Sequence, residues 1–130
     1  MAQALGCKSP LPDRRASAVA PQTAAKSPLL QPVLPQDVSS IARALFAEPE
    51  QERSILCQKL FDRADLAAVH VAQTRALHPL WGDGSLDAAA RHSMGPLCSE
   101  PLWDDLNYIR CLRIALAMLD WRLTRGHVRV

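Results

Sequence analysis

The sequence predicts an all-α protein: a small bundle of about four helices with a disordered N-terminal arm. Two observations lead to this prediction. Apolar residues recur at helical spacing in the segments after residue 34, and glycine and proline fall between those segments. The 130 residues allow one domain, in which roughly 90 folded residues can bury a modest core without disulfides or a metal.

Proline and charge divide the chain into three predicted parts: a Pro-rich tail at 1–33, a helical domain at 34–126 and a frayed end at 127–130. Six of the ten prolines lie in the first 35 residues, where no apolar periodicity is visible. Four basic residues and one acidic residue also lie there, so the formal net charge of this segment is +3. Because the whole chain has a formal net charge of +2, the remaining residues have a net charge of −1. The folded part is therefore not a basic surface.

The first two predicted helices meet at Pro49. Leu34 and Pro35 are a good entry to a helix from Val38 to Phe46, since proline at the first helical position costs no hydrogen bond. Pro49 ends that helix and opens the next, which continues in helical phase to about Ala76.

The segment 78–86 predicts a compact turn. Pro79 biases the residue before it away from helical dihedrals, and two glycines flank the aspartate of the turn. Ser85 is placed to cap a short helix that begins at Leu86 and ends before Gly95. The turn reads His78-Pro79-Leu80-Trp81-Gly82-Asp83-Gly84-Ser85-Leu86.

A long final helix is predicted from Leu102 to Arg125, with Gly126 as its end, and we expect the other helices to pack around it. Its apolar residues form two stripes. One stripe holds Leu102, Ile109, Leu112, Leu116, Leu119 and Leu123, and the other holds Trp103, Cys111, Ile114, Ala117, Met118 and Trp121. No run of about 18 apolar residues occurs, because Arg110, Arg113 and Asp120 interrupt the best candidate, so no membrane span is expected.

The Leu34-Pro35 entry, the helix pair, the turn at 78–86 and the Leu-rich final helix together resemble a family of short alphaproteobacterial proteins with no assigned activity. The resemblance covers residues 34–125. It implies a bacterial, cytoplasmic protein with one compact helical unit, and it assigns no catalytic residue.

The turn is also a possible site, formed by His78, Trp81, Asp83 and Ser85. A Gly-rich turn before a helix can bind an anion, but Asp83 and Asp87 would repel a phosphate, and the later ligands of a calcium loop are missing. We favour a structural interpretation in which Trp81 fills a pocket between helices and Ser85 acts as a cap.

Histidine and cysteine spacing predicts no metal site, because no Cys-x-x-Cys or His-x-x-x-His pair occurs. Cys57 and Cys111 are expected to be small buried hydrophobes. Cys98, in a loop, is the cysteine that we expect to be the most reactive, and a Cys98 and His92 nucleophile pair stays a hypothesis that spacing does not test. Four cysteines without a secretory signal favour free thiols in a reducing compartment.

The two apolar stripes of the final helix, together with the lack of a catalytic, metal or nucleotide motif, favour a non-catalytic protein-interaction or accessory module without a cofactor. The anchors would be Trp103, Ile114, Met118 and Trp121, which would contact a protein partner or a second copy through the final helix. Enclosure of that helix by the other three is the alternative. A nucleic-acid-binding role is disfavoured, because the arginines at 110, 113, 122, 125 and 129 point at several angles and acids share the helix.

Overall fold

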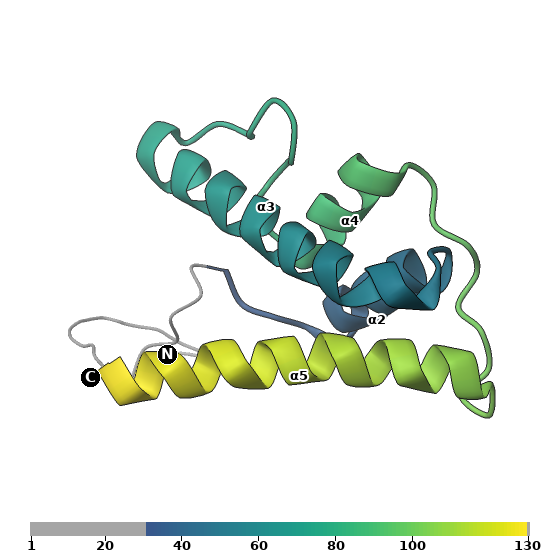
Figure 1. Cartoon of the computed structure of the whole chain (residues 1–130). Helices are drawn as coiled ribbons and strands as arrows, with labels where there is room; N and C mark the ends of the chain where they lie inside the picture. Colours follow the sequence, from purple (N-terminus) through teal and green to yellow (C-terminus); the bar gives the residue numbers. More distant parts are fainter. Residues whose placement is uncertain (1–30, 130) are drawn as a thin grey trace, which may run out of the picture. The chain divides into compact units, whose positions relative to one another are not determined.

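The computed structural model describes residues 31–129, and side chains as far as residue 125. Four α-helices pack together in this part of the chain, which has no strand and only an isolated bridge between His78 and Gly82 (Figure 1). The predicted fold class is confirmed. The helices are α2 (Pro35–Phe46), α3 (Arg53–Thr74), α4 (Leu86–Met94) and α5 (Leu106–Arg129), with a 3-10 turn, η2 (Glu50–Glu52), before α3.

Residues 1–30 of the disordered arm, which the sequence predicts to span 1–33, lie outside the described part of the chain. The last residues assigned to that arm already contact the helical domain. The Gln31 side-chain amide donates a 3.2 Å hydrogen bond to the carbonyl of Asp83, and Val33 packs against the core.

The core is formed by one face of each helix and contains many alanines. Because alanine side chains are small, the helix axes can approach closely where they meet. The buried residues are Ile41, Ala42, Ala44 and Leu45 of α2, Cys57, Leu60, Phe61 and Ala64 of α3, Leu86, Ala89 and Ala90 of α4, and Tyr108, Cys111, Leu112 and Ala115 of α5.

The end of α2 is tied to the start of α3 by Arg53, which is only 8% exposed. Its Nε donates hydrogen bonds of 3.0 Å to the carbonyls of both Leu45 and Glu48. Carbonyls at the end of a helix lack partners within the helix, so a cation there satisfies them and complements the helix dipole.

Two acids join α2 to α4. Asp37 is buried, and its two carboxylate oxygens accept hydrogen bonds from the backbone N–H groups of Leu34 and Asp87. Ser40 donates from α2 to the Asp87 carboxylate, which also pairs with Arg91 at 2.9 Å. Burial opposes ionisation of Asp87, but the hydrogen bonds from Ser40 and Arg91 outweigh it and lower the pKa of this carboxyl.

α5 begins and ends later than the sequence predicts. Asp105 accepts from the backbone N–H of Tyr108 at 3.3 Å and so acts as an N-cap; a cap residue is not itself helical, and the residues from Leu102 to Asp105 form a turn. At the other end the helix continues through Gly126 to Arg129. Glycine costs a helix only about 1 kcal/mol relative to alanine, and no proline follows it.

The prediction that the other helices surround α5 is wrong. α5 buries a single face, formed by Tyr108, Cys111, Leu112 and Ala115. Leu112 and Cys111 come from the two different predicted stripes, and Tyr108 and Ala115 belong to neither. The outer edges of the stripes are open, since Leu116 is 51% exposed and Trp121 is 56% exposed. Enclosure of α5 within the described chain is therefore also excluded.

Candidate functional site

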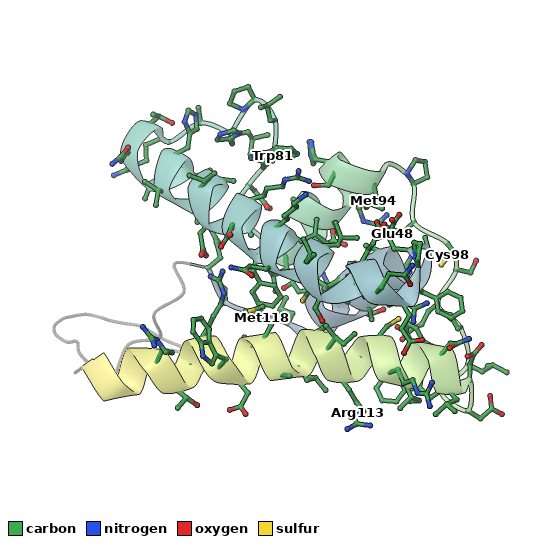
Figure 2. The ribbon with its side chains drawn as sticks, viewed as in Figure 1. Glu48, Trp81, Met94, Cys98, Arg113 and Met118 are labelled. Carbon is green, nitrogen blue, oxygen red and sulfur yellow. The ribbon has the colours of Figure 1, made fainter. Side chains whose placement is uncertain are left out.

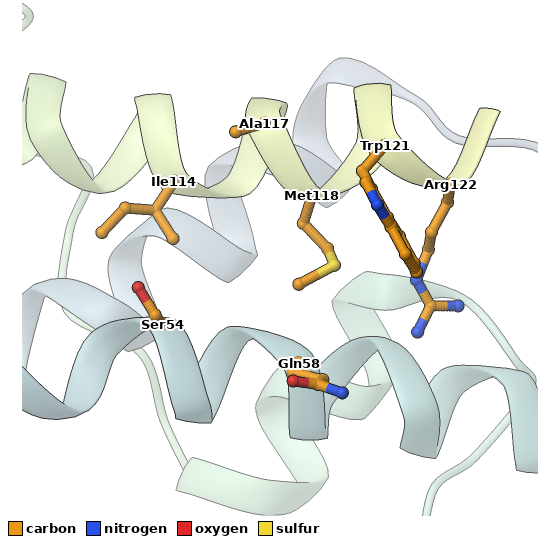
Figure 3. Close-up of a pocket in the computed structure, with 7 residues that line it drawn as sticks. All are labelled: Ser54, Gln58, Ile114, Ala117, Met118, Trp121 and Arg122. Carbon is orange, nitrogen blue, oxygen red and sulfur yellow. The ribbon is translucent and has the colours of Figure 1, made fainter. Parts of the chain in front are cut away.

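The open edge of α5 that carries Trp121 forms a groove with α3, which we call the α3/α5 groove. It has a volume of about 470 Å³ and is lined by Ser54 and Gln58 of α3 and by Ile114, Ala117, Met118, Trp121 and Arg122 of α5 (Figure 3). Ser54 lies opposite Ile114 and Gln58 lies opposite Met118, so the two helices run in the same direction along the groove. The wall formed by α5 is apolar except for Arg122, and the wall formed by α3 is neutral and polar.

Arg122 closes one end of the α3/α5 groove by pairing with two acids of α3. Its guanidinium bonds to Asp62 at 2.8 Å and also to Asp65, and it lies 5.1 Å from the centre of the Phe61 ring. The Arg122 side chain is 14% exposed, whereas Asp62 and Asp65 are 57% and 44% exposed. Two carboxylates face one guanidinium, so this end of the groove has an excess negative charge that water can reach.

The other open edge of α5 lines a second groove, the α2/α5 groove, of about 690 Å³. Its walls include Leu34, Val38, Trp103, Leu112, Leu116 and Leu119. Glu100 orders its rim, accepting hydrogen bonds of 2.9 Å from both the Trp103 indole and the Tyr108 hydroxyl. The hydrogen bonds from Trp103 and from Tyr108 lower the pKa of Glu100.

The structure brings together three of the four predicted partner-binding residues. Ile114, Met118 and Trp121 line the α3/α5 groove, and Trp103 lies in the turn before α5 and lines the α2/α5 groove instead. Sequence reasoning missed Asp62 and Asp65. Their partner lies 57 to 60 residues further along the chain, and local spacing carries no information about such a pair.

In the turn at 78–86, the polar groups bond to the turn itself. His78 Nδ1 accepts from the backbone N–H groups of Leu80 and Trp81 at 3.0 and 3.1 Å. Asp83 accepts from the N–H of Ser85, and the Ser85 hydroxyl accepts from that of Ala88, as a cap does. The predicted cap is confirmed, and these hydrogen bonds support the structural interpretation of the turn.

The side chain of Trp81, which the sequence predicts to fill a pocket between helices, contacts α3 and the turn itself. Trp81 is half-buried (labelled in Figure 2). The Arg63 guanidinium of α3 lies 4.5 Å from its ring centre, and the His78 ring is stacked on it with 6.5 Å between the ring centres. An amphipathic aromatic ring of this kind packs well against a cation at a surface.

The cysteines of the described chain are free thiols. Both Cys57 and Cys111 are buried, as predicted. Burial raises the pKa of Cys57 to about 12 and also raises the pKa of Cys111, which favours the neutral thiol at both positions. Cys98 is exposed, and its carbonyl accepts from Arg43 at 2.7 Å. His92, its hypothetical partner, lies against Gly82, where an added Cβ would stand 3.1 Å from His92 Nε2.

Two classes of site have no candidate among the described residues of the chain. His, Cys, Asp and Glu side chains do not gather there in groups that could hold a metal ion. Within the same residues, even the longest helices are not apolar enough to cross a membrane.

A family model described as a domain of unknown function (DUF7742) matches residues 31–119. The chain belongs to the DUF7742 family. The match includes α2, α3, α4 and the first part of α5, and thus Ser54, Gln58, Ile114, Ala117 and Met118 of the α3/α5 groove; Trp121 and Arg122 lie just beyond it. No curated protein and no solved structure matches this DUF7742 chain.

Proposed function

We propose that this protein is a non-catalytic interaction module that binds one amphipathic helix of a protein partner in the α3/α5 groove. The observation that supports this most is the grouping of Ile114, Met118 and Trp121 along one open groove. Large aromatic and flexible apolar side chains of this kind commonly anchor helix-in-groove contacts. Trp121 is 56% exposed, so a partner would remove a substantial apolar area from water.

Charge indicates which kind of helix fits. The wall formed by Ser54 and Gln58 is neutral, and Asp62 and Asp65 outnumber Arg122 at one end. The best complement is a helix with an apolar stripe at spacings of three and four residues and a basic residue beside the end of that stripe.

Nucleic-acid binding has less support. Arg122 is neutralised by two carboxylates, and Arg113 points away from the other helices (Figure 2), so these arginines do not share one face. A catalytic turn also has less support, because the side chains of His78, Asp83 and Ser85 already accept hydrogen bonds from the turn's own backbone.

Site-specific photocrosslinking in the cells that make the protein tests the proposal. A benzophenone amino acid at Gln58, whose side chain lies in the groove and is exposed, should give a covalent adduct with a protein. The crosslinked peptide should map to an amphipathic helix with a basic residue beside its apolar stripe. The same amino acid at Arg113 is the matched control and should give no such adduct.

A second variant separates binding from folding. Trp121→Glu should abolish the Gln58 adduct while the far-ultraviolet circular dichroism spectrum stays helical, because the Trp121 side chain is more than half exposed. The proposal is overturned by the absence of any Gln58 adduct, by adducts that map to non-helical segments, or by equal adducts from Arg113.

A further inference from the structure

We infer that the helix that fills the α3/α5 groove is α5 of a second copy of this chain, in an antiparallel pair related by a two-fold axis. This inference rests on the function proposed above and names the partner for the same groove. Three features of the groove support it: its self-complementary shape, the alanine at its centre and the placement of charge along it.

The shape is self-complementary because each copy carries both the anchor and the groove. In a two-fold contact the same surface is used by both copies, so residue i of one meets residue j of the other and the reverse also holds. Ile114 and Trp121 lie one on either side of Ala117 along the groove. An antiparallel pair centred near Ala117 therefore places each Trp121 beside the Ile114 of the other copy.

Ala117 allows the two α5 helices to approach closely. Its side chain is exposed and contributes only a methyl group to the wall, midway between two larger apolar residues. Helices pack with axes 8 to 10 Å apart, and the shorter distances require small residues at the crossing point. Arg110, Ile114, Ala117 and Trp121 follow one another at spacings of four, three and four residues, which is the seam spacing of paired helices.

The charges favour the antiparallel direction. Arg110 is exposed and lies on this seam one turn before Ile114, whereas Asp62 and Asp65 lie at the opposite end of the groove, beside Arg122. Reversing the second α5 brings its Arg110 toward the carboxylates of the first copy. α5 is therefore itself an amphipathic helix with a basic residue beside its apolar stripe, which is the chemistry that the groove requires.

Sedimentation equilibrium of the full chain tests the pairing. The wild type should be a dimer at high concentration and dissociate on dilution. Trp121→Glu should raise the dissociation constant by more than roughly a hundredfold, as loss of a buried aromatic anchor does, and Arg110→Asp by roughly tenfold. Leu116→Glu is the matched control, since Leu116 lies on the other edge of α5 and is 51% exposed, and it should leave the constant unchanged.

A cysteine at the symmetry axis tests the geometry. In a background with Cys7→Ser and Cys98→Ser, Ala117→Cys should form an intermolecular disulfide in oxidised glutathione, because equivalent residues at a two-fold axis face each other within bonding reach. Arg113→Cys should not. Reduction should restore the monomer band on a denaturing gel.

The outcomes separate this inference from the function on which it rests. A chain that is monomeric at all concentrations overturns the pairing, as does a dimer that Leu116→Glu weakens as much as Trp121→Glu. An Ala117→Cys variant that forms no disulfide also overturns it. If the Gln58 photocrosslink then maps to a helix of another protein, the interaction function stands without self-pairing; if it yields no adduct, both fail.

Discussion

The hydroxyl of Tyr108 donates a 2.9 Å hydrogen bond to the carboxylate of Glu100, which joins α5 to the loop before it. Tyr108 is fully buried, and burial raises the pKa of its phenol. The same oxygen lies 3.3 Å from the Ser39 hydroxyl, so one phenol connects α2, α5 and the intervening loop. The hydrogen bond, rather than the ring alone, should therefore contribute to stability.

Tyr108→Phe tests that contribution. The variant keeps the edge-on contact of the ring with Phe46 and removes only the hydroxyl, so it should lower the free energy of unfolding by about 1 kcal/mol. Urea denaturation measures this as a lower midpoint with an unchanged slope. Equal midpoints for the two proteins would show that water replaces the phenol without loss.

Protonation of Asp87 should make the free energy of unfolding depend on pH in the acidic range. Its pKa is lower in the folded state than in the unfolded state, so the stability it contributes is present above about pH 4 and is lost as the pH falls through the folded pKa. Ser40→Ala removes a donor to the carboxylate. The variant should lose stability less steeply below about pH 4 than the wild type in urea titrations at several pH values. Parallel curves would contradict the assignment.

Gly84 should tolerate no side chain. Its φ is +97°, and an added Cβ would stand 2.7 Å from the Cα of Ala68 in α3. Gly84→Ala should therefore lower the free energy of unfolding by about 3 kcal/mol or more, from backbone strain and overpacking together.

Gly95→Ala is the matched control for Gly84. Gly95 also has a positive φ, of +76°, but an added Cβ there has no heavy atom within 4 Å. Gly95→Ala should lower the free energy of unfolding by about 1 kcal/mol, which is the cost of backbone strain alone. Thermal or urea unfolding that ranks the two variants the other way would refute the packing argument.

Arg122→Met should weaken the connection between α3 and α5. The variant keeps an apolar side chain at this position but removes the guanidinium that lies over the Phe61 ring, and it leaves Asp62 and Asp65 without their partner. Both acids are about half exposed, so water compensates in part and the loss should be about 1 kcal/mol. Asp65→Asn should cost more than Asp62→Asn, because Asp65 is the less exposed acid. Chemical denaturation of the three variants provides the comparison.

Alkylation should separate the cysteines by burial. In the native protein iodoacetamide should modify Cys98 rapidly, while Cys57, whose pKa is raised to about 12, and Cys111 should react only on unfolding. Mass spectrometry of peptides after timed quenching gives the rates. Rapid native labelling of Cys57 would mean that α3 and α5 separate readily.

Features set by neighbouring residues could be predicted from the sequence. The Ser85 cap, the positive φ of Gly84, the end of α4 at Gly95 and the start of α2 at Pro35 all follow from local chemistry. The start of α5 was misplaced because Leu102 and Trp103 continue the apolar spacing, and only the cap by Asp105 shows that the helix begins later.

Only part of the candidate site could be predicted, because only part of it is set by neighbouring residues. Helical spacing put Ile114, Met118 and Trp121 on one face, which is a local property, but it could not show which edge of that face the rest of the chain would cover. That depends on Arg122 meeting Asp62 and Asp65 in another helix. Trp103 was grouped with the others by spacing alone and belongs to the α2/α5 groove.

The two hydrogen bonds from Arg53 to Leu45 and Glu48 have a consequence for how the molecule opens. Arg53 lies in the first turn of α3, and its two acceptors lie at and just after the end of α2. Opening of either helix end therefore breaks both hydrogen bonds. Amide protons in the last turn of α2 and the first turn of α3 should therefore exchange with solvent at a common rate, as one cooperative unit, and Arg53→Met should release both sets together.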